Sequence, residues 1–177
     1  MTKPRLILDQ DDVLADTHGK LANIVLREFD TKLTYEELHQ ASFYETLSQA
    51  EQKRLYKILH EPGFFSDIPL IPNAQEAVLE LNKKYEIFVA TAAMEFPNSF
   101  REKYDWLHRH FGFISWSNIV FCGDKSILNG DYLIDDMPRN LKTFKGEGRL
   151  LFNAPHNLTE TTFERVMNWN EILERLL

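Results

Sequence analysis

Cysteine is nearly absent from the sequence, which limits where the protein is expected to work. Cys122 is the only cysteine among 177 residues, so no disulfide can form within the chain. This favours a reducing cytoplasm.

Long apolar runs are absent too. Nothing approaches the roughly 20 residues of a membrane span, and Leu6–Leu8 is too short for the apolar region of a signal peptide. We therefore expect a soluble cytoplasmic protein that does not associate with a membrane.

Blocks of basic residues are also absent. The chain has 20 Lys and Arg residues against 27 Asp and Glu residues, a formal net charge of −7. Proteins that bind nucleic-acid polymers usually gather Lys and Arg into patches that follow the phosphates. This class is therefore excluded on electrostatic grounds. A small phosphorylated substrate stays compatible with the charge, because a bound cation can reverse the local field.

The sequence does have a large apolar fraction, arranged in short runs. Hydrophobic residues make up 44% of the chain, enough for one packed core domain. The runs alternate with helical patterns, which predicts an α/β fold with a mostly parallel sheet. We expect strands at Arg5–Asp9, Glu86–Thr91, Asn118–Phe121, Tyr132–Ile134 and Arg149–Phe152. Helices are expected from Asn73, as N-cap, to Lys84, and from about residue 98 to Phe111, before Gly112.

The segment between the first two expected strands contains only helical signals. Asp16 can cap a first helix, and capping boxes at Thr34–Glu37 and Ser48–Glu51 open two more. A crossover between parallel strands needs only a dozen or so residues, far fewer than this segment has. We therefore predict a helical cap at residues 17–72, inserted after the first strand into a core of residues 1–16 and 73–177. A helix-rich crossover packed on the sheet is the alternative.

Polar residues that can do chemistry follow the expected strands. "LILDQDDVLAD" crowds four acids after the first apolar run, and side chains two apart at a strand end, such as Asp9 and Asp11, project to the same side. Ligands of open α/β sheets bind at the carboxyl edge of the strands. A metal ion, a catalytic task or a screened turn would each explain the acids. The other residues expected at this edge are Thr91, Lys125, Asp135 and Asp136.

These stretches resemble a known enzyme superfamily. "LDQDDVLAD", "VATAA", "GDKS" and "DYLIDDMP" are similar to the four motifs of the haloacid dehalogenase (HAD) superfamily of phosphohydrolases. More narrowly, "ATAAMEFPNSFREKYDWLHRHFGFI" and "FCGDKSILNGDYLIDDMPRNL" resemble the 5'(3')-deoxyribonucleotidase family, and the likeness continues through "FNAPHN" to "NWNEI". The resemblance implies a HAD-like Rossmannoid core. It also implies a Mg²⁺-dependent phosphomonoesterase that acts on (deoxy)nucleoside monophosphates through an aspartyl-phosphate.

The resemblance also implies roles for single residues. Asp9 would be the nucleophile and a Mg²⁺ ligand. Asp11 would protonate the leaving oxygen, then activate water, and its backbone carbonyl would complete the metal site. Thr91 and Lys125 would bind the phosphate. Of the later acid pair, Asp136 is the better candidate for direct metal ligation and Asp135 for an indirect role, although the sequence leaves the assignment open.

The chain departs from the family where the nucleoside would bind. Relatives often have glycine at the position of Asp12, an aromatic residue at that of Thr17 and arginine at that of Met137. Phe64 and Phe65 in "EPGFF" are the best candidates to face the substrate; the alternative is a hinge packed on the core. The expected partner is a small phosphorylated substrate such as a pyrimidine deoxynucleotide, with the base, the sugar and the oligomeric state left open. A sugar-phosphate phosphatase and a catalytically silent nucleotide-binding protein are the competing interpretations.

Overall fold

The computed structural model describes residues 2–40 and 43–177, so residue 1 of the expected core and residues 41 and 42 of the expected cap lie outside it. Six strands form one sheet in the order β3-β2-β1-β4-β5-β6, and every neighbouring pair is parallel. The strands are β1 (Arg5–Leu8), β2 (Glu86–Thr91), β3 (Ile119–Phe121), β4 (Tyr132–Asp135), β5 (Gly148–Phe152) and β6 (Glu164–Val166). The prediction of an α/β fold with a parallel sheet is confirmed.

The first five strands match the expected ranges to within a residue or so at each end, and β6 was missed. Its three residues, Glu164–Val166, have only one buried side chain and therefore no apolar run that marks a strand. The strand exists because its backbone pairs with β5, an interaction between residues distant in sequence.

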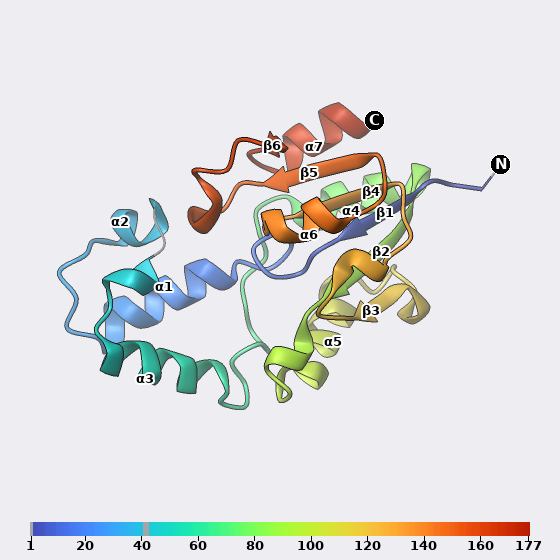
Figure 1. Cartoon of the computed structure of the whole chain (residues 1–177). Helices are drawn as coiled ribbons and strands as arrows, with labels where there is room; N and C mark the ends of the chain where they lie inside the picture. The colour runs from blue at the N-terminus through green and yellow to red at the C-terminus, as the bar shows by residue number, and fades with distance from the viewer. Residues whose placement is uncertain (1, 41–42) are drawn as a thin grey trace.

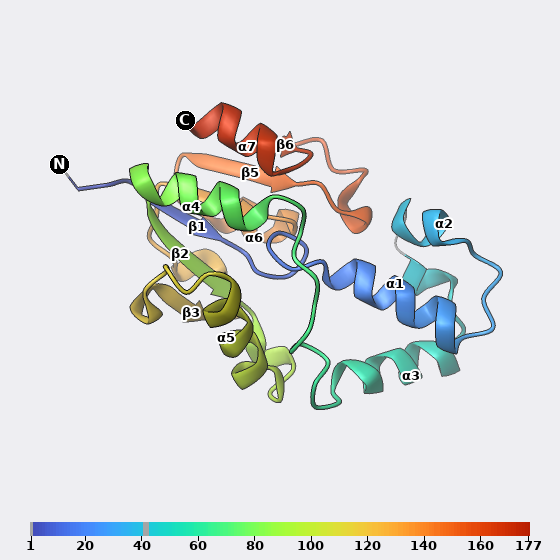
Figure 2. The same cartoon turned by 180° about the vertical axis from the view of Figure 1, so that it is seen from behind.

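Helices cover both faces of the sheet. Along β1, Leu6 and Leu8 belong to one apolar core while Ile7 belongs to another, as the two-residue period of a strand requires. The helices α4 (Ala74–Lys84), α5 (Ser99–His110) and α7 (Trp169–Leu176) pack on the first face. The short helix α6 (Pro138–Thr143) packs on the other. In Figure 1 α6 lies in front of the sheet and α4 behind it, and in Figure 2, seen from behind, α4 lies in front.

The segment between β1 and α4 is helical, as expected, and extends beyond the carboxyl ends of the strands (Figure 1). It contains α1 (Thr17–Glu28), α2 (Tyr35–Gln40), the 3₁₀ helix Phe43–Thr46 and α3 (Gln49–Leu59). The three predicted caps are confirmed: Gly19 N–H donates to Asp16, and both capping boxes are formed. No helix in the part of the chain that the structure describes is long and apolar enough to cross a membrane.

The predicted side-chain cap of α4 is wrong. Asn73 does precede the helix, but its side chain accepts no hydrogen bond from the first turn. Its backbone is left-handed, with φ of 65° and ψ of 5°, whereas a side-chain N-cap needs an extended backbone. Asparagine tolerates the left-handed region better than most residues, which explains the residue type at this position.

Candidate active site

The carboxyl edge of the sheet joins residues from opposite halves of the chain around Lys125. Asp9 follows β1, Asp135 ends β4, and Lys125 begins a 3₁₀ helix after β3. The buried Lys125 Nζ lies 2.5 Å from Asp9 Oδ1 and 2.7 Å from Asp135 Oδ2. These charges raise the pKa of Lys125 against the effect of burial, so the group stays an ammonium. Burial raises the pKa of Asp9 to about 6, although Lys125 opposes the shift.

The adjacent acids Asp135 and Asp136 differ in the number of hydrogen-bond donors around their carboxylates. Asp135 is fully buried and accepts hydrogen bonds from Lys125, from the backbone N–H of Met137 and from the side-chain amide of Asn140. Both of its oxygens are therefore occupied.

Asp136, by contrast, keeps one oxygen free. Its Oδ2 lies 2.8 Å from His156 Nε2, and its buried Oδ1 has no hydrogen-bond partner among the residues that the structure describes. Burial raises the pKa of Asp136 well above its ordinary value, and the His156 hydrogen bond opposes this. The pKa of His156 is raised, because its contacts with Asp136 outweigh the cost of burying its charge. A buried carboxylate oxygen without a donor is costly unless a cation or water reaches it.

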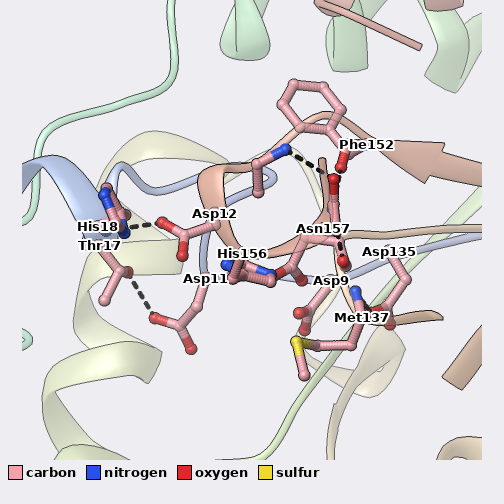
Figure 3. A network of polar contacts seen from close by, with 12 residues as sticks. Asp9, Asp11, Asp12, Thr17, His18, Asp135, Met137, Phe152, His156 and Asn157 are labelled. Carbon is pink, nitrogen blue, oxygen red and sulfur yellow. Dashed lines mark hydrogen bonds and ion pairs between the residues drawn. The ribbon is translucent and has the colours of Figure 1, made fainter. Parts of the chain in front are cut away.

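The carboxylate of Asp11 is held on both oxygens. Thr17 Oγ1 donates to Oδ1 at 2.8 Å, as Figure 3 shows, and Lys103 Nζ forms an ion pair with Oδ2. Lys103 comes from α5 and is 2% exposed. It also donates to Thr91 Oγ1 at 3.0 Å. Thr91 itself is fully buried beneath the edge of the sheet.

Asp12 shapes the loop after β1. It has a positive φ of 54°, and its Oδ1 accepts the backbone N–H of His18 at 2.7 Å (Figure 3). Burial raises its pKa to about 7. Aspartate is among the few residue types other than glycine that enter the left-handed region readily, which is how the chain turns here without glycine.

A cavity of about 260 Å³ opens over these acids. Asp9, Asp11, Lys125 and Asp136 are among its polar lining residues, and other lining residues are apolar. Of the two candidate aromatic residues, Phe65 lines the cavity, whereas Phe64 packs beside Lys20, whose Nζ lies 4.7 Å from the ring centroid. We call the apolar lining residues the apolar wall: Leu21, Leu59, Phe65, Ala92, Phe96 and Met137.

The donor set fits a hard divalent cation. One oxygen from each of Asp9, Asp135 and Asp136 lies within 4.8 Å of the other two. Mg²⁺ prefers oxygen ligands and usually takes one or two carboxylates together with waters and substrate phosphate. The unpartnered Oδ1 of Asp136 is the oxygen that such an ion would satisfy.

Lys103 and His156 belong to the site but were missed from the sequence. Lys103 stands three residues before Trp106 and four before Leu107, on the buried face of α5, so helical spacing was the signal that could have found it. His156 stands in "FNAPHN", a stretch that supported the family resemblance, without a spacing that links it to Asp136. Both contacts depend on residues distant along the chain, and tertiary packing alone reveals them.

Comparison with known proteins places the chain among nucleotidases. The family described as "5' nucleotidase, deoxy (Pyrimidine), cytosolic type C protein" matches residues 3–177. A Staphylococcus epidermidis protein with the provisional name 5'(3')-deoxyribonucleotidase is 42% identical over 97% of this chain and 95% of its own. The 5'(3')-deoxyribonucleotidase of Bacillus subtilis is 46% identical over 64% of this chain and 65% of its own.

Solved structures agree on the fold. A haloacid dehalogenase-like hydrolase from Streptococcus pneumoniae superposes with a TM-score of 0.66 over 99% of both chains, at 12% sequence identity. A provisionally assigned HAD hydrolase from Bacillus subtilis, bound to magnesium, gives a TM-score of 0.59 over 99% of both chains at 13% identity. The expected HAD-like fold is therefore confirmed.

Proposed function

The chain belongs to the 5'-nucleotidase family described as deoxy (pyrimidine), cytosolic type C, and on this basis we propose that it is a Mg²⁺-dependent phosphomonoesterase of (deoxy)nucleoside monophosphates. One observation carries the proposal. Asp9, Asp11, Lys125 and Asp136 line one cavity, although they come from opposite halves of the chain. A protein that only bound nucleotides would need neither the second aspartate nor an unpartnered buried carboxylate oxygen.

Asp9 is the proposed nucleophile. In the first half-reaction one of its oxygens bonds to phosphorus, the bond from phosphorus to the sugar oxygen breaks, and Asp11 gives that oxygen a proton. In the second half-reaction a water oxygen bonds to phosphorus and its proton passes to Asp11. The bond between Asp9 and phosphorus then breaks, which releases inorganic phosphate.

The metal would be held by Asp9, Asp136 and the backbone carbonyl of Asp11. Bound Mg²⁺ supplies positive charge that removes the repulsion between the phosphoryl oxygens and the attacking carboxylate. Asp135 has no free oxygen, so its proposed role is to position Lys125. The free Oδ1 supports Asp136 as the direct ligand.

Phosphate and nucleoside would occupy different parts of the cavity. Lys125 stays charged and lies beside Asp9, where it can neutralise a phosphate oxygen; Thr91 is the proposed hydroxyl partner. The apolar wall, which includes Phe65 and Phe96, is suited to the flat face of a base. Part of this wall, Leu21, Leu59 and Phe65, comes from residues 17–72, which supports the proposal that this segment acts as a cap.

The direct test is phosphate release from a panel of substrates, with and without Mg²⁺. The panel contains deoxyuridylate, thymidylate, the matching ribonucleotides and several sugar phosphates. We expect turnover of nucleoside monophosphates that requires Mg²⁺ and stops when the metal is chelated. Preference for sugar phosphates would indicate a different HAD phosphatase. Binding of nucleotides without any turnover would indicate a silent binding protein and contradict the proposal.

A further inference from the structure

Lys103 is an unusual residue in this site because a lysine is rarely so buried without a specific partner. Its side chain is 2% exposed, and its ammonium contacts three groups. It forms an ion pair with Asp11 Oδ2, it donates to Thr91 Oγ1 at 3.0 Å, and it lies 4.8 Å from the centroid of the Phe65 ring. Neither the fold nor the phosphate site already described requires a cation at this position.

We propose that Lys103 is a positioning residue that fixes the carboxylate of Asp11 toward the leaving oxygen of the substrate. The inference rests on the proposed function and extends it to a residue outside the four HAD-like motifs. It predicts a specific kinetic effect: loss of Lys103 impairs proton delivery to the leaving group more than it impairs attack on phosphorus.

The contacts of Asp11 support this role. Its side chain is 29% exposed, so it could rotate in the open cavity unless it were held. Thr17 holds Oδ1 with one hydrogen bond of 2.8 Å, and Lys103 holds Oδ2 with a charged contact. Charge-assisted hydrogen bonds are roughly twice as strong as neutral ones, so Lys103 contributes the larger restraint. Misplacing a reacting group by about 1 Å can cost ~10²-fold in rate.

The contact with Thr91 has a second consequence. An ammonium has only donors, so Thr91 Oγ1 must be the acceptor in this pair. The hydroxyl proton of Thr91 is then left to point away from Lys103. Lys103 thereby orients the two polar groups that the proposed mechanism needs beside the phosphate.

Glu102, the residue before Lys103, positions the loop that packs against the Lys103 ammonium. Glu102 accepts the backbone N–H of Gly63 at 2.5 Å and that of Phe65 at 2.9 Å. These bonds fix the loop that carries the Phe65 ring against the ammonium. The aromatic face attracts the cation and shields it from water, which strengthens its interaction with Asp11.

The test compares two substrates in the first turnover of Lys103→Met. Deoxyuridylate has a poor alkoxide leaving group that needs a proton, whereas p-nitrophenyl phosphate releases a stable phenolate that does not. We expect nucleoside release to slow by ~10²-fold, within the range of general acid catalysis. Release of p-nitrophenol should slow only a few-fold. Any effect through Thr91 is common to both substrates, so the ratio of the two reports on Asp11.

Two further variants serve as controls. Lys20 also forms an ion pair, with Asp67, and lies against an aromatic ring, that of Phe64, but it does not line the cavity. Lys20→Met should therefore leave both first-turnover rates unchanged. Lys103→Arg keeps the charge and should restore part of the rate with deoxyuridylate. If Lys103→Met does not fold, Lys103→Arg tests the proposal by itself. Its first turnover should slow more with deoxyuridylate than with p-nitrophenyl phosphate.

The outcomes separate this inference from the proposed function. A larger slowdown with deoxyuridylate than with p-nitrophenyl phosphate in a folded variant supports it. Equal slowing of both substrates, a larger slowdown with p-nitrophenyl phosphate, or no slowdown overturns it while the proposed function stands. If the unmodified protein hydrolyses neither substrate with Mg²⁺, the proposed function and this inference both fail.

Discussion

Asp135 and Asp136 show how neighbouring residues of the same type acquire different roles. They share one strand end, but Asp135 is surrounded by donors. Within the described part of the chain, the Asp136 carboxylate contacts only His156 and keeps one oxygen free. The difference arises from what the fold places beside each carboxylate. It makes Asp136 a group that can accept a cation and Asp135 a group that holds Lys125.

The two acids should therefore respond differently to the same substitution. Asp136→Asn should raise the Mg²⁺ concentration needed for half-maximal activity at least ~10–100-fold, because it removes charge from the metal site. Asp135→Asn should lower the free energy of unfolding by ~1.5–3 kcal/mol, because it weakens charged hydrogen bonds in the core. Magnesium titrations and urea unfolding of both variants measure these effects. The reverse pattern would contradict the assignment.

His156 should influence the metal through Asp136, although it also lines the cavity. Its Nε2 binds Asp136 Oδ2 at 2.8 Å, whereas Oδ1 has no hydrogen-bond partner among the described residues. Partners of metal ligands typically change metal affinity ~10–100-fold when they are removed. We expect His156→Ala to weaken Mg²⁺ binding by this amount, while kcat recovers at saturating Mg²⁺. A kcat that stays low at saturating Mg²⁺ would show that His156 acts elsewhere.

At the scale of elements, sequence patterns predicted helix caps correctly where the two residues of the cap lie close together in the chain. The capping box of α3 joins Ser48 and Glu51, three residues apart, and its sequence signature predicted it correctly. Asn73 carries a residue type that is also favoured at caps, but its left-handed backbone prevents the hydrogen bond. Residue type alone therefore does not identify a cap.

Stability measurements can separate these two helix starts. Ser48→Ala should lower the free energy of unfolding by ~1 kcal/mol, the usual effect of losing a side-chain cap. Asn73→Gly should change it by less than ~0.5 kcal/mol, because no cap is lost and glycine suits a φ of 65°. Urea unfolding monitored by circular dichroism gives both values. Equal losses would mean that Asn73 caps α4 after all.

The same distinction explains what the sequence could not predict. The strands up to β5 and the acids at their ends follow from apolar runs and chain order. Strand β6 and the partners of Lys103 and His156 depend on contacts between distant residues. Short, polar segments carry no apolar pattern. Helical spacing can place Lys103 on the same face as Trp106 and Leu107, but it does not identify the partner of its ammonium.

At the scale of the whole molecule, α5 connects the chemistry to the helical segment. Side chains of α5 and of Asn98, which precedes it, bind the backbone of residues 60–68 at several points: Asn98 to His60, Glu102 to Gly63 and Phe65, Trp106 to Ile68, and Arg109 to Ser66. The proposed cap is thus attached to the core along the helix that also supplies Lys103.

Loosening this attachment should affect binding more than chemistry. Glu102→Ala leaves two backbone N–H groups of the loop without their acceptor. We expect KM for deoxyuridylate to rise several-fold and proteolysis between residues 61 and 66 to accelerate, while kcat falls much less than in Lys103→Met. Arg101→Ala on the same helix, which removes only an exposed ion pair with Asp105, should change neither. Equal effects of both variants would contradict the proposed attachment.

The most direct test of the account is to find where the phosphoryl group is attached during turnover. Asp11→Asn should still react with p-nitrophenyl phosphate, which needs no proton, but should hydrolyse the aspartyl-phosphate slowly. After an acid quench and digestion, mass spectrometry should then find the phosphoryl group on Asp9. Adding Asp9→Asn to this variant should abolish the signal. A phosphoryl group on another residue, or none despite turnover of the unmodified protein, would contradict the account.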